Sequence, residues 1–140
     1  MNAAIFSFFG IVVGASLQYF FGRHLDDQKH LRELRTKAYT DYLLCVCEHA
    51  NLARQKQSAK GRELFVKTAD AKSRICLYGS ASSVNALALF ERLGATMTTQ
   101  EQRISFTELV SAMRTDSGSS VEVELNNLEV ILLGQDDENT

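Results

Sequence analysis

The N-terminal segment constrains the fold of this chain more than any other part of the sequence. From Ala3 to Phe21 the sequence runs for nineteen residues without a formal charge. An unbroken helix of that length would reach about 28 Å, close to the hydrocarbon thickness of a bilayer. A core helix of a soluble protein would carry a polar stripe, and Ser7, Ser16 and Gln18 are too sparse to form one. We therefore predict a transmembrane anchor over residues 1–22.

Two other interpretations of this segment stay open. The small residues Val13, Gly14 and Ala15 before Ser16 could suit a signal peptidase, so the segment could be a cleaved signal. Against this, no basic side chain precedes the segment, and its apolar sequence continues past the cleavage point. The segment could also be the central helix of a soluble core. The anchor explains its length and its lack of a polar stripe best.

Basic residues follow the segment closely, and no lysine or arginine precedes it. By the positive-inside rule, this asymmetry places the C-terminal part of the chain in the cytoplasm. Each basic side chain near the cytoplasmic leaflet contributes about 1 kcal/mol of attraction to anionic lipid. We expect juxtamembrane lipid contact from five residues: Arg23, Lys29, Arg32, Arg35 and Lys37.

Gly10 and Gly14 form a GxxxG pattern inside the apolar segment, and Gln18 follows one turn later on the same helical face. Two glycines one turn apart let a second helix approach closely, and a glutamine can hydrogen-bond across that contact. Glycine is also simply common in membrane helices. We expect Gly10, Gly14 and Gln18 to form a surface for self-association of the chain.

Residues 23–57 have the pattern of one long amphipathic helix. Apolar and small residues recur at steps of three and four along one face, which must be buried against other elements. The face consists of Leu31, Leu34, Ala38, Tyr42, Cys45, His49 and Ala53. Whether this helix is continuous with the anchor through Gly22 stays open.

The remaining sequence predicts shorter helices separated by turns. A turn around Gly61 precedes a helix over residues 62–78, and the serines after Gly79 precede a helix over residues 84–93. Thr98 with Glu101, or Thr99 with Gln102, forms a capping box for the next helix, and residues 124–133 form the last one. The chain contains no proline, which favours uninterrupted helices.

The predicted fold class is therefore all-α. A transmembrane helix over residues 1–22 precedes an antiparallel bundle of four or five helices over residues 23–133. Residues 134–140 form a disordered acidic tail.

The composition and motifs argue against several functions. A net charge of −2 gives no basic footprint for nucleic acid, and the sequence contains no GxxxxGK[ST], GxGxxG or GxSxG motif. Cys45 and His49 are spaced for one helical face, with Cys47 nearby, but a zinc site needs three or four converging ligands. With Cys76, the cysteines are odd in number and fit a reducing compartment. We expect no catalytic residue, no metal and no cofactor.

Two runs of sequence carry a resemblance. Residues 31–46, LRELRTKAYTDYLLCV, and residues 106–118, FTELVSAMRTDSG, match the patterns "LR..AY.dfl" and "f..lv.aMR.d.g". In these runs the chain resembles a broad set of uncharacterised short bacterial proteins with an N-terminal transmembrane helix and a cytosolic helical domain. The resemblance implies that architecture and a membrane location, and it implies no activity. By their spacing, Tyr39, Tyr42, Met113 and Arg114 are expected to be packing and helix-end residues.

These observations together predict a non-enzymatic interaction or scaffold protein. It would be anchored by a single pass in the bacterial inner membrane, with its C-terminal domain in the cytoplasm. Its partners would be the lipid bilayer and either a second copy of the chain or another protein. The alternative is an oligomeric membrane effector, in which several spans assemble into a pore or a membrane-disrupting bundle gated by the soluble domain.

Overall fold

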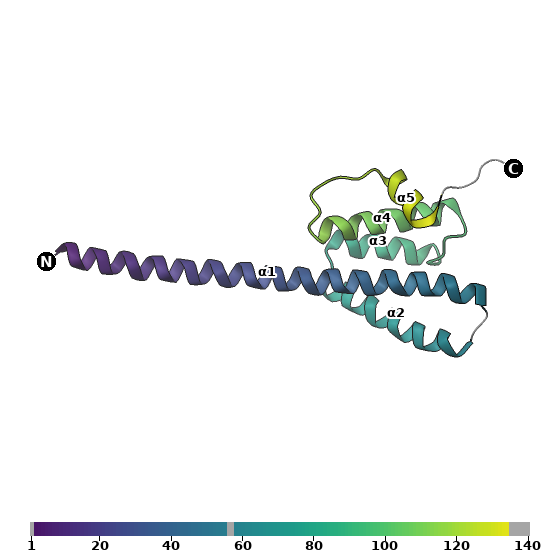
Figure 1. Cartoon of the computed structure of the whole chain (residues 1–140), viewed down its shortest axis with the longest axis horizontal. Coiled ribbons are helices and arrows are strands. Elements are labelled where there is room, and N and C mark those ends of the chain that lie inside the picture. The colour runs from purple at the N-terminus through teal and green to yellow at the C-terminus, as the bar shows by residue number, and fades with distance from the viewer. Residues whose placement is uncertain (1, 56–57, 135–140) are drawn as a thin grey trace. The chain divides into compact units, whose positions relative to one another are not determined.

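A computed structural model of the chain describes residues 2–55 and 58–134, and describes side chains over residues 10–50 and 60–134. Within these ranges, every regular element is an α-helix (Figure 1). The helices are α1 (Asn2–Gln55), α2 (Ser58–Tyr78), α3 (Ala81–Arg92), α4 (Gln100–Asp116) and α5 (Leu125–Leu133). The predicted all-α class is confirmed. The chain divides between Arg32 and Glu33 into two compact units.

The first unit is the N-terminal part of α1. The helix continues through Gly22, which the sequence had left open. Every side chain described from Gly10 to Arg32 is exposed, including the large apolar ones. Ile11, Phe20 and Phe21, for example, each keep about two thirds of their surface accessible, at 67%, 68% and 66%. This stretch therefore exposes apolar surface to its surroundings.

The predicted transmembrane helix over residues 1–22 is not supported in the part of the chain that the structure describes. There, no helix is both long enough and apolar enough to cross a membrane. Residues 1–9 of the predicted span lie outside the residues whose side chains are described.

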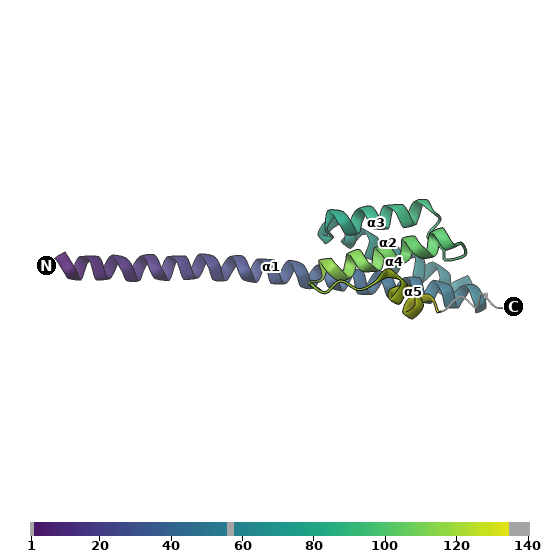
Figure 2. The same cartoon turned by 90° about the horizontal axis from the view of Figure 1, so that it is seen from above.

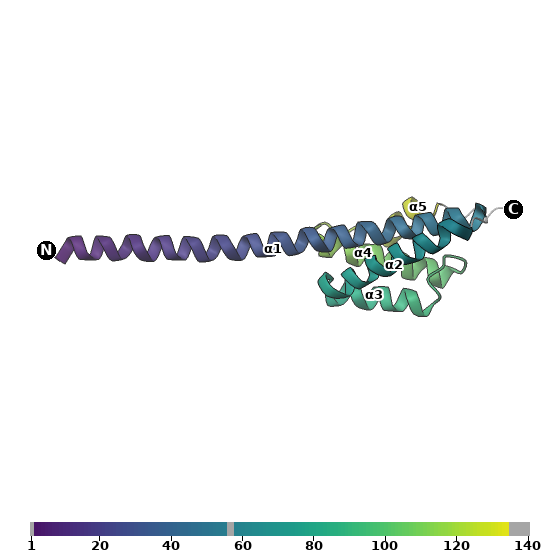
Figure 3. The same cartoon turned by 90° about the horizontal axis from the view of Figure 1, so that it is seen from below.

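The second unit, from Glu33 onward, is a helical bundle, as predicted. Successive helices from α1 to α4 reverse direction, as the three views show together (Figures 1, 2 and 3). Its core combines the middle of α1 with α2, α3 and α4, and the rings of Phe90 and Phe106 lie 5.3 Å apart at its centre. The four largest fully buried side chains belong to Tyr42, Phe90, Ile75 and Leu109. On α2, Leu64, Thr68, Ala71 and Ile75 recur at helical spacing and are buried, whereas Tyr78 at the same spacing is only partly buried.

The apolar face predicted for α1 is buried only in its middle. Ala38, Tyr42 and Cys45 are buried, whereas Leu31 is 41% exposed and His49 is also exposed, so the prediction was wrong at these two positions. The reason is that the buried cluster takes residues of α1 only from Ala38 to Val46, the region where α2, α3 and α4 meet it. Ala53 lies outside the residues whose side chains are described.

The boundaries of the shorter helices follow their local chemistry. Gly61, predicted as a turn, lies inside α2, and residues 56–57 between α1 and α2 lie outside the described residues. Ser80 caps α3 by accepting a hydrogen bond from the Ser83 backbone N–H. Of the two predicted capping boxes, the one formed by Thr99 and Gln102 is present at the start of α4.

The last helix, α5, is the least buried element of the second unit. It packs on α4 and contains no fully buried residue. Glu129 on α5 lies 3.5 Å from the Nε atom of Arg103 and accepts a hydrogen bond from Gln100, both on α4. The helical assignment of residues 124–133 is thus confirmed from Leu125 onward. In the predicted acidic tail, residues 135–140 lie outside the described residues.

Candidate functional site

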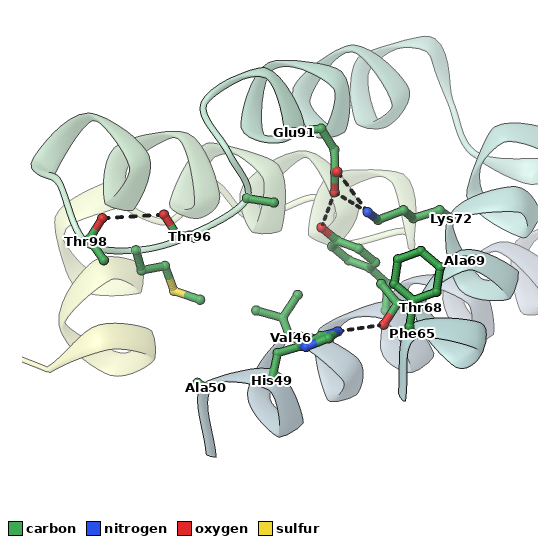
Figure 4. Close-up of a pocket in the computed structure, with 13 residues that line it drawn as sticks. Val46, His49, Ala50, Phe65, Thr68, Ala69, Lys72, Glu91, Thr96 and Thr98 are labelled. Carbon is green, nitrogen blue, oxygen red and sulfur yellow. Dashed lines mark hydrogen bonds and ion pairs between the residues drawn. The ribbon is translucent and has the colours of Figure 1, made fainter. Parts of the chain in front are cut away.

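A cavity of about 640 Å³ opens between α1, α2 and the connection from α3 to α4. All the residues that line it belong to the second unit. Val46, Phe65, Ala69 and Met97 provide much of its apolar wall. Figure 4 shows Phe65, Thr68 and Ala69 on one side of the cavity and Thr96 and Thr98 on the opposite side.

One corner of the cavity carries paired charges. Lys72 on α2 approaches both carboxylate oxygens of Glu91 on α3, each at 2.8 Å from Nζ. The Tyr42 hydroxyl on α1 donates to Glu91 Oε1 at 3.2 Å, so the corner joins three helices (Figure 4). Burial, reinforced by the nearby negative charge of Glu91, raises the pKa of Tyr42 well above its usual range. Tyr42 therefore stays a protonated donor to Glu91.

His49 and Thr68 form a second polar pair in the lining of the cavity. The Nε2 atom of His49 lies 3.2 Å from the Thr68 hydroxyl oxygen, and that hydroxyl lies 2.7 Å from the Leu64 carbonyl oxygen. A hydroxyl has one proton, and a carbonyl can only accept. Thr68 therefore donates to Leu64, and His49 donates to Thr68 from Nε2.

No metal centre accompanies this histidine among the residues that the structure describes. Nowhere in those ranges do three side chains of the metal-ligating types His, Cys, Asp or Glu gather closely enough to hold an ion. Cys45 is buried in the core, and Cys47 is exposed. Cys45 and His49 are four residues apart on α1 but lie in different environments, because Cys45 is buried and His49 is exposed.

A second polar cluster, centred on Asp116, lies at the C-terminal end of α4. The Asp116 carboxylate accepts hydrogen bonds from Arg35 at 2.7 Å, from the Tyr39 hydroxyl, and from the Ser80 backbone N–H at 3.0 Å. Arg35 also donates from Nε to the Tyr78 carbonyl oxygen at 2.6 Å. The cluster ties α1 and α4 to the turn between α2 and α3.

The two runs that carry the resemblance meet in this cluster. Arg35 and Tyr39 belong to the first run and Asp116 to the second, and all three occupy lettered positions of the quoted patterns. Tyr39, Tyr42 and Met113 are buried, as their assignment to packing predicted, and Arg114 lies in the last turn of α4. The two runs of this chain thus contact each other within the bundle.

The residues predicted to mediate self-association lie in the first unit. Gly10, Gly14 and Gln18 are exposed on α1, and a Cβ atom placed on either glycine would meet no other atom within 4 Å. The surface they form is open. The structure contains one copy of the chain, so their association stays a prediction.

The five predicted lipid-contact residues fall into two groups. Arg23, Lys29, Arg32 and Lys37 are exposed. Arg35 instead points its guanidinium at Asp116, and its side chain is only 21% exposed. Lipid contact by the other four stays a prediction.

Sequence reasoning missed the residues that organise both polar sites. Asp116 had no apolar periodicity to mark it, and Lys72 and Glu91 were indistinguishable from solvated charges on exposed faces. A usable signal was the spacing of Arg35 and Tyr39, which places two hydrogen-bond donors one turn apart on the same face of α1. Nothing in the sequence named their acceptor, which is 81 and 77 residues away.

Comparisons with protein families, with curated proteins and with solved structures return no match for this chain.

Proposed function

We propose that this chain is a non-enzymatic interaction protein held at a membrane by the N-terminal part of α1, with its helical bundle available to a partner. The observation that carries the proposal is the exposed apolar surface of the first unit. Ile11, Val12 and Val13 follow one another along the helix and so point in different directions, yet all three are exposed. A helix that is apolar on every side requires an apolar environment, which a bilayer or another protein can provide.

The bilayer is the environment that the rest of the segment favours. The full apolar stretch from Ala3 to Phe21 matches the bilayer thickness, and the basic residues follow at its C-terminal end only. We propose a single pass through the bacterial inner membrane with the bundle in the cytoplasm. Arg23, Lys29, Arg32 and Lys37 would then face the anionic leaflet.

Self-association is the interaction that the exposed glycines favour. Gly10 and Gly14 leave open space beside α1, and Gln18 lies on the same face. In lipid, helices associate through close packing at such small residues. Because Gly10, Gly14 and Gln18 are spaced four residues apart, they lie in a row along one face of the helix. We propose that copies of the chain associate through this face.

The test combines membrane fractionation with crosslinking of the full-length chain. We expect the protein to remain in the membrane pellet after carbonate extraction and to crosslink as a discrete oligomer. Gly10→Leu/Gly14→Leu should stay in the pellet but lose the oligomer, because leucine side chains hold the helices apart. The matched control is Val12→Leu/Ser16→Leu, which places two leucines at the same four-residue spacing on another face of the helix. This variant should keep the oligomer.

Two results would count against the proposal. Recovery of the wild-type chain in the carbonate-soluble fraction would remove the membrane assignment. An oligomer that survives in Gly10→Leu/Gly14→Leu would move the self-association to another surface and leave the anchor in place.

A further inference from the structure

We infer that the cavity between α1, α2 and the α3–α4 connection binds an uncharged, mostly apolar small molecule that carries one hydrogen-bond acceptor. The cavity lies entirely in the second unit, so this inference does not rest on the membrane proposal. Its volume of about 640 Å³ lies in the range of small-molecule sites, roughly 300–1,000 Å³. Its walls are largely apolar, which such sites also share.

The hydrogen bonds of the lining side chains define the polar part of the ligand. Tyr42 donates to Glu91, Thr68 donates to Leu64, and His49 donates to Thr68. Across the cavity, the hydroxyls of Thr96 and Thr98 both donate to Gln102 Oε1, at 2.8 and 2.9 Å. Each of these donors is already used within the protein.

Lys72 is different. An ammonium group has three protons, and its two contacts with the Glu91 oxygens use two of them. Among the lining side chains that the structure describes, Lys72 therefore has a donor to spare for a ligand. A single acceptor on the ligand, such as a carbonyl oxygen, satisfies it.

The charges at the same corner exclude an ionised ligand. Lys72 and Glu91 neutralise each other, so the cavity offers no net charge to a bound ion. An anion at Lys72 would lie next to the Glu91 carboxylate and would be repelled by it. A cation at Glu91 would lie next to the Lys72 ammonium group and would be repelled by it. An uncharged ligand avoids both costs.

The test uses the absence of tryptophan from this sequence. Phe65→Trp places a single fluorophore in the wall of the cavity, and Val121→Trp places one at an exposed site that does not line it. The probe is a bromobiphenyl with an acetyl group, whose bromine quenches tryptophan on contact. In full-length chains kept in identical buffer or detergent, we expect saturable quenching of the Phe65→Trp reporter only. Equal, non-saturating quenching of both reporters would overturn the inference.

Two further probes test the ligand class. The bromobiphenyl with a carboxylate in place of the acetyl group should bind at least tenfold more weakly, and equal binding would contradict the exclusion of anions. The bromobiphenyl with an ethyl group has no acceptor and should bind about fivefold more weakly than the acetyl compound. In Lys72→Met this difference between acetyl and ethyl should disappear, and its persistence would assign the acceptor to another group.

A blocking variant separates the cavity from the rest of the surface. In the Phe65→Trp background, Ala69→Phe fills the cavity from α2 and should weaken binding of the acetyl compound at least tenfold. Val66→Phe adds the same ring to an exposed position of α2 outside the cavity and should leave binding unchanged. Thermal unfolding of both variants verifies that they fold. Unchanged affinity in a folded Ala69→Phe chain would place the probe elsewhere.

Discussion

At the scale of single residues, Asp116 has the largest set of long-range partners described here. Its carboxylate is the common acceptor for a guanidinium and a phenol on α1 and for a backbone N–H in the turn between α2 and α3. Its side chain is only 10% exposed. Donors that lose such an acceptor are left with unsatisfied hydrogen-bonding groups away from water, which costs more than the hydrogen bond itself contributes.

We predict that Asp116→Asn lowers the free energy of unfolding by about 2–4 kcal/mol. Arg35 loses its charge partner, and the new asparagine NH2 group faces a hydrogen-bond donor where a carboxylate oxygen accepted before. Urea titration monitored by circular dichroism measures the change. The matched control is Asp70→Asn, which breaks an ion pair with Arg74 but at a carboxylate that is 64% exposed. It should cost no more than about 0.5 kcal/mol. Equal effects of the two substitutions would refute a special role for Asp116.

The buried tyrosines predict how stability depends on pH. Burial is the largest cause that raises the pKa of Tyr39, followed by its hydrogen bond to Asp116, and burial likewise raises the pKa of Tyr42. The unfolded chain therefore releases these protons first, from about pH 10 upward. In that range the folded chain binds more protons than the unfolded chain, so stability is complete below about pH 10 and falls as the pH rises.

The expected slope is up to about 1.4 kcal/mol per pH unit for each tyrosine. Tyr42→Phe removes one of these groups and should make the alkaline decline shallower than in the wild type. Chemical denaturation at several pH values above and below 10 provides the measurement. A decline of the same slope in Tyr42→Phe would assign the alkaline sensitivity to other groups.

Two glycines provide opposite tests of local packing. A Cβ atom on Gly79, next to the α2–α3 turn, would lie 2.6 Å from the Ile75 carbonyl oxygen and 3.1 Å from the Tyr39 hydroxyl. A Cβ atom on Gly61, inside α2, would meet nothing within 4 Å. Gly79→Ala should lower the free energy of unfolding by about 1–3 kcal/mol, because backbone must shift. Gly61→Ala should raise it by about 0.5–1 kcal/mol through helix propensity.

Thermal unfolding of Gly79→Ala and Gly61→Ala beside the wild type tests these two predictions. The midpoints should move in opposite directions from the same chemical change. A stabilised Gly79→Ala chain would show that the turn has room that its contacts do not indicate.

At the scale of elements, Gln102 organises the connection between α3 and α4. Its side-chain oxygen accepts hydrogen bonds from the backbone N–H groups of Thr98 and Thr99, and its amide donates to the Leu93 carbonyl at 2.6 Å. One side chain thus joins the end of one helix to the start of the next. The connection also forms one wall of the cavity through Thr96, Met97 and Thr98.

We predict that Gln102→Ala lowers the free energy of unfolding by about 1–2 kcal/mol, because the capping box and the bond to Leu93 are lost together. Thr99→Ala removes the side-chain cap alone and should cost about 1 kcal/mol, whereas Thr99→Ser keeps the hydroxyl and should cost little. Denaturant midpoints for the three variants test this order. An equal loss in Thr99→Ser would mean that the hydroxyl is not the stabilising group.

The elements themselves were predictable where sequence periodicity and capping agree. Most residues at helical spacing on α2 and α4 are buried, with Tyr78 and Val110 only partly so. The sequence offered two capping boxes for the start of α4, and the structure contains the one formed by Thr99 and Gln102. Gly61 was misassigned because glycine is a breaker by propensity, a cost of about 1 kcal/mol that a long helix can absorb. The cavity could not be predicted, since its lining comes from three helices and the α3–α4 connection, and sequence spacing does not reveal how these segments approach one another.

At the scale of the whole molecule, the buried core residues that the structure describes all belong to the second unit. Its buried members run from Ala38 to Met113. We predict that a fragment starting at Glu33 folds cooperatively, with a free energy of unfolding within about 1 kcal/mol of the full-length value, because it keeps every one of these contacts. Comparison of denaturation curves tests this. A fragment that lacks a cooperative transition would show that residues 1–32 contribute to the core.

The cluster around Asp116 also determines when the bundle can be completed during synthesis. Arg35 and Tyr39 leave the ribosome long before their acceptor, which follows them by 81 and 77 residues. At roughly 5–20 residues per second, these donors wait several seconds for Asp116 to be translated. Until then the nascent chain has α1, α2 and α3 without the contact that joins them to α4. The hydrogen bonds to Asp116 therefore form late in synthesis. A ribosome that stalls before codon 116 would carry a nascent chain in which Arg35 and Tyr39 have no such acceptor.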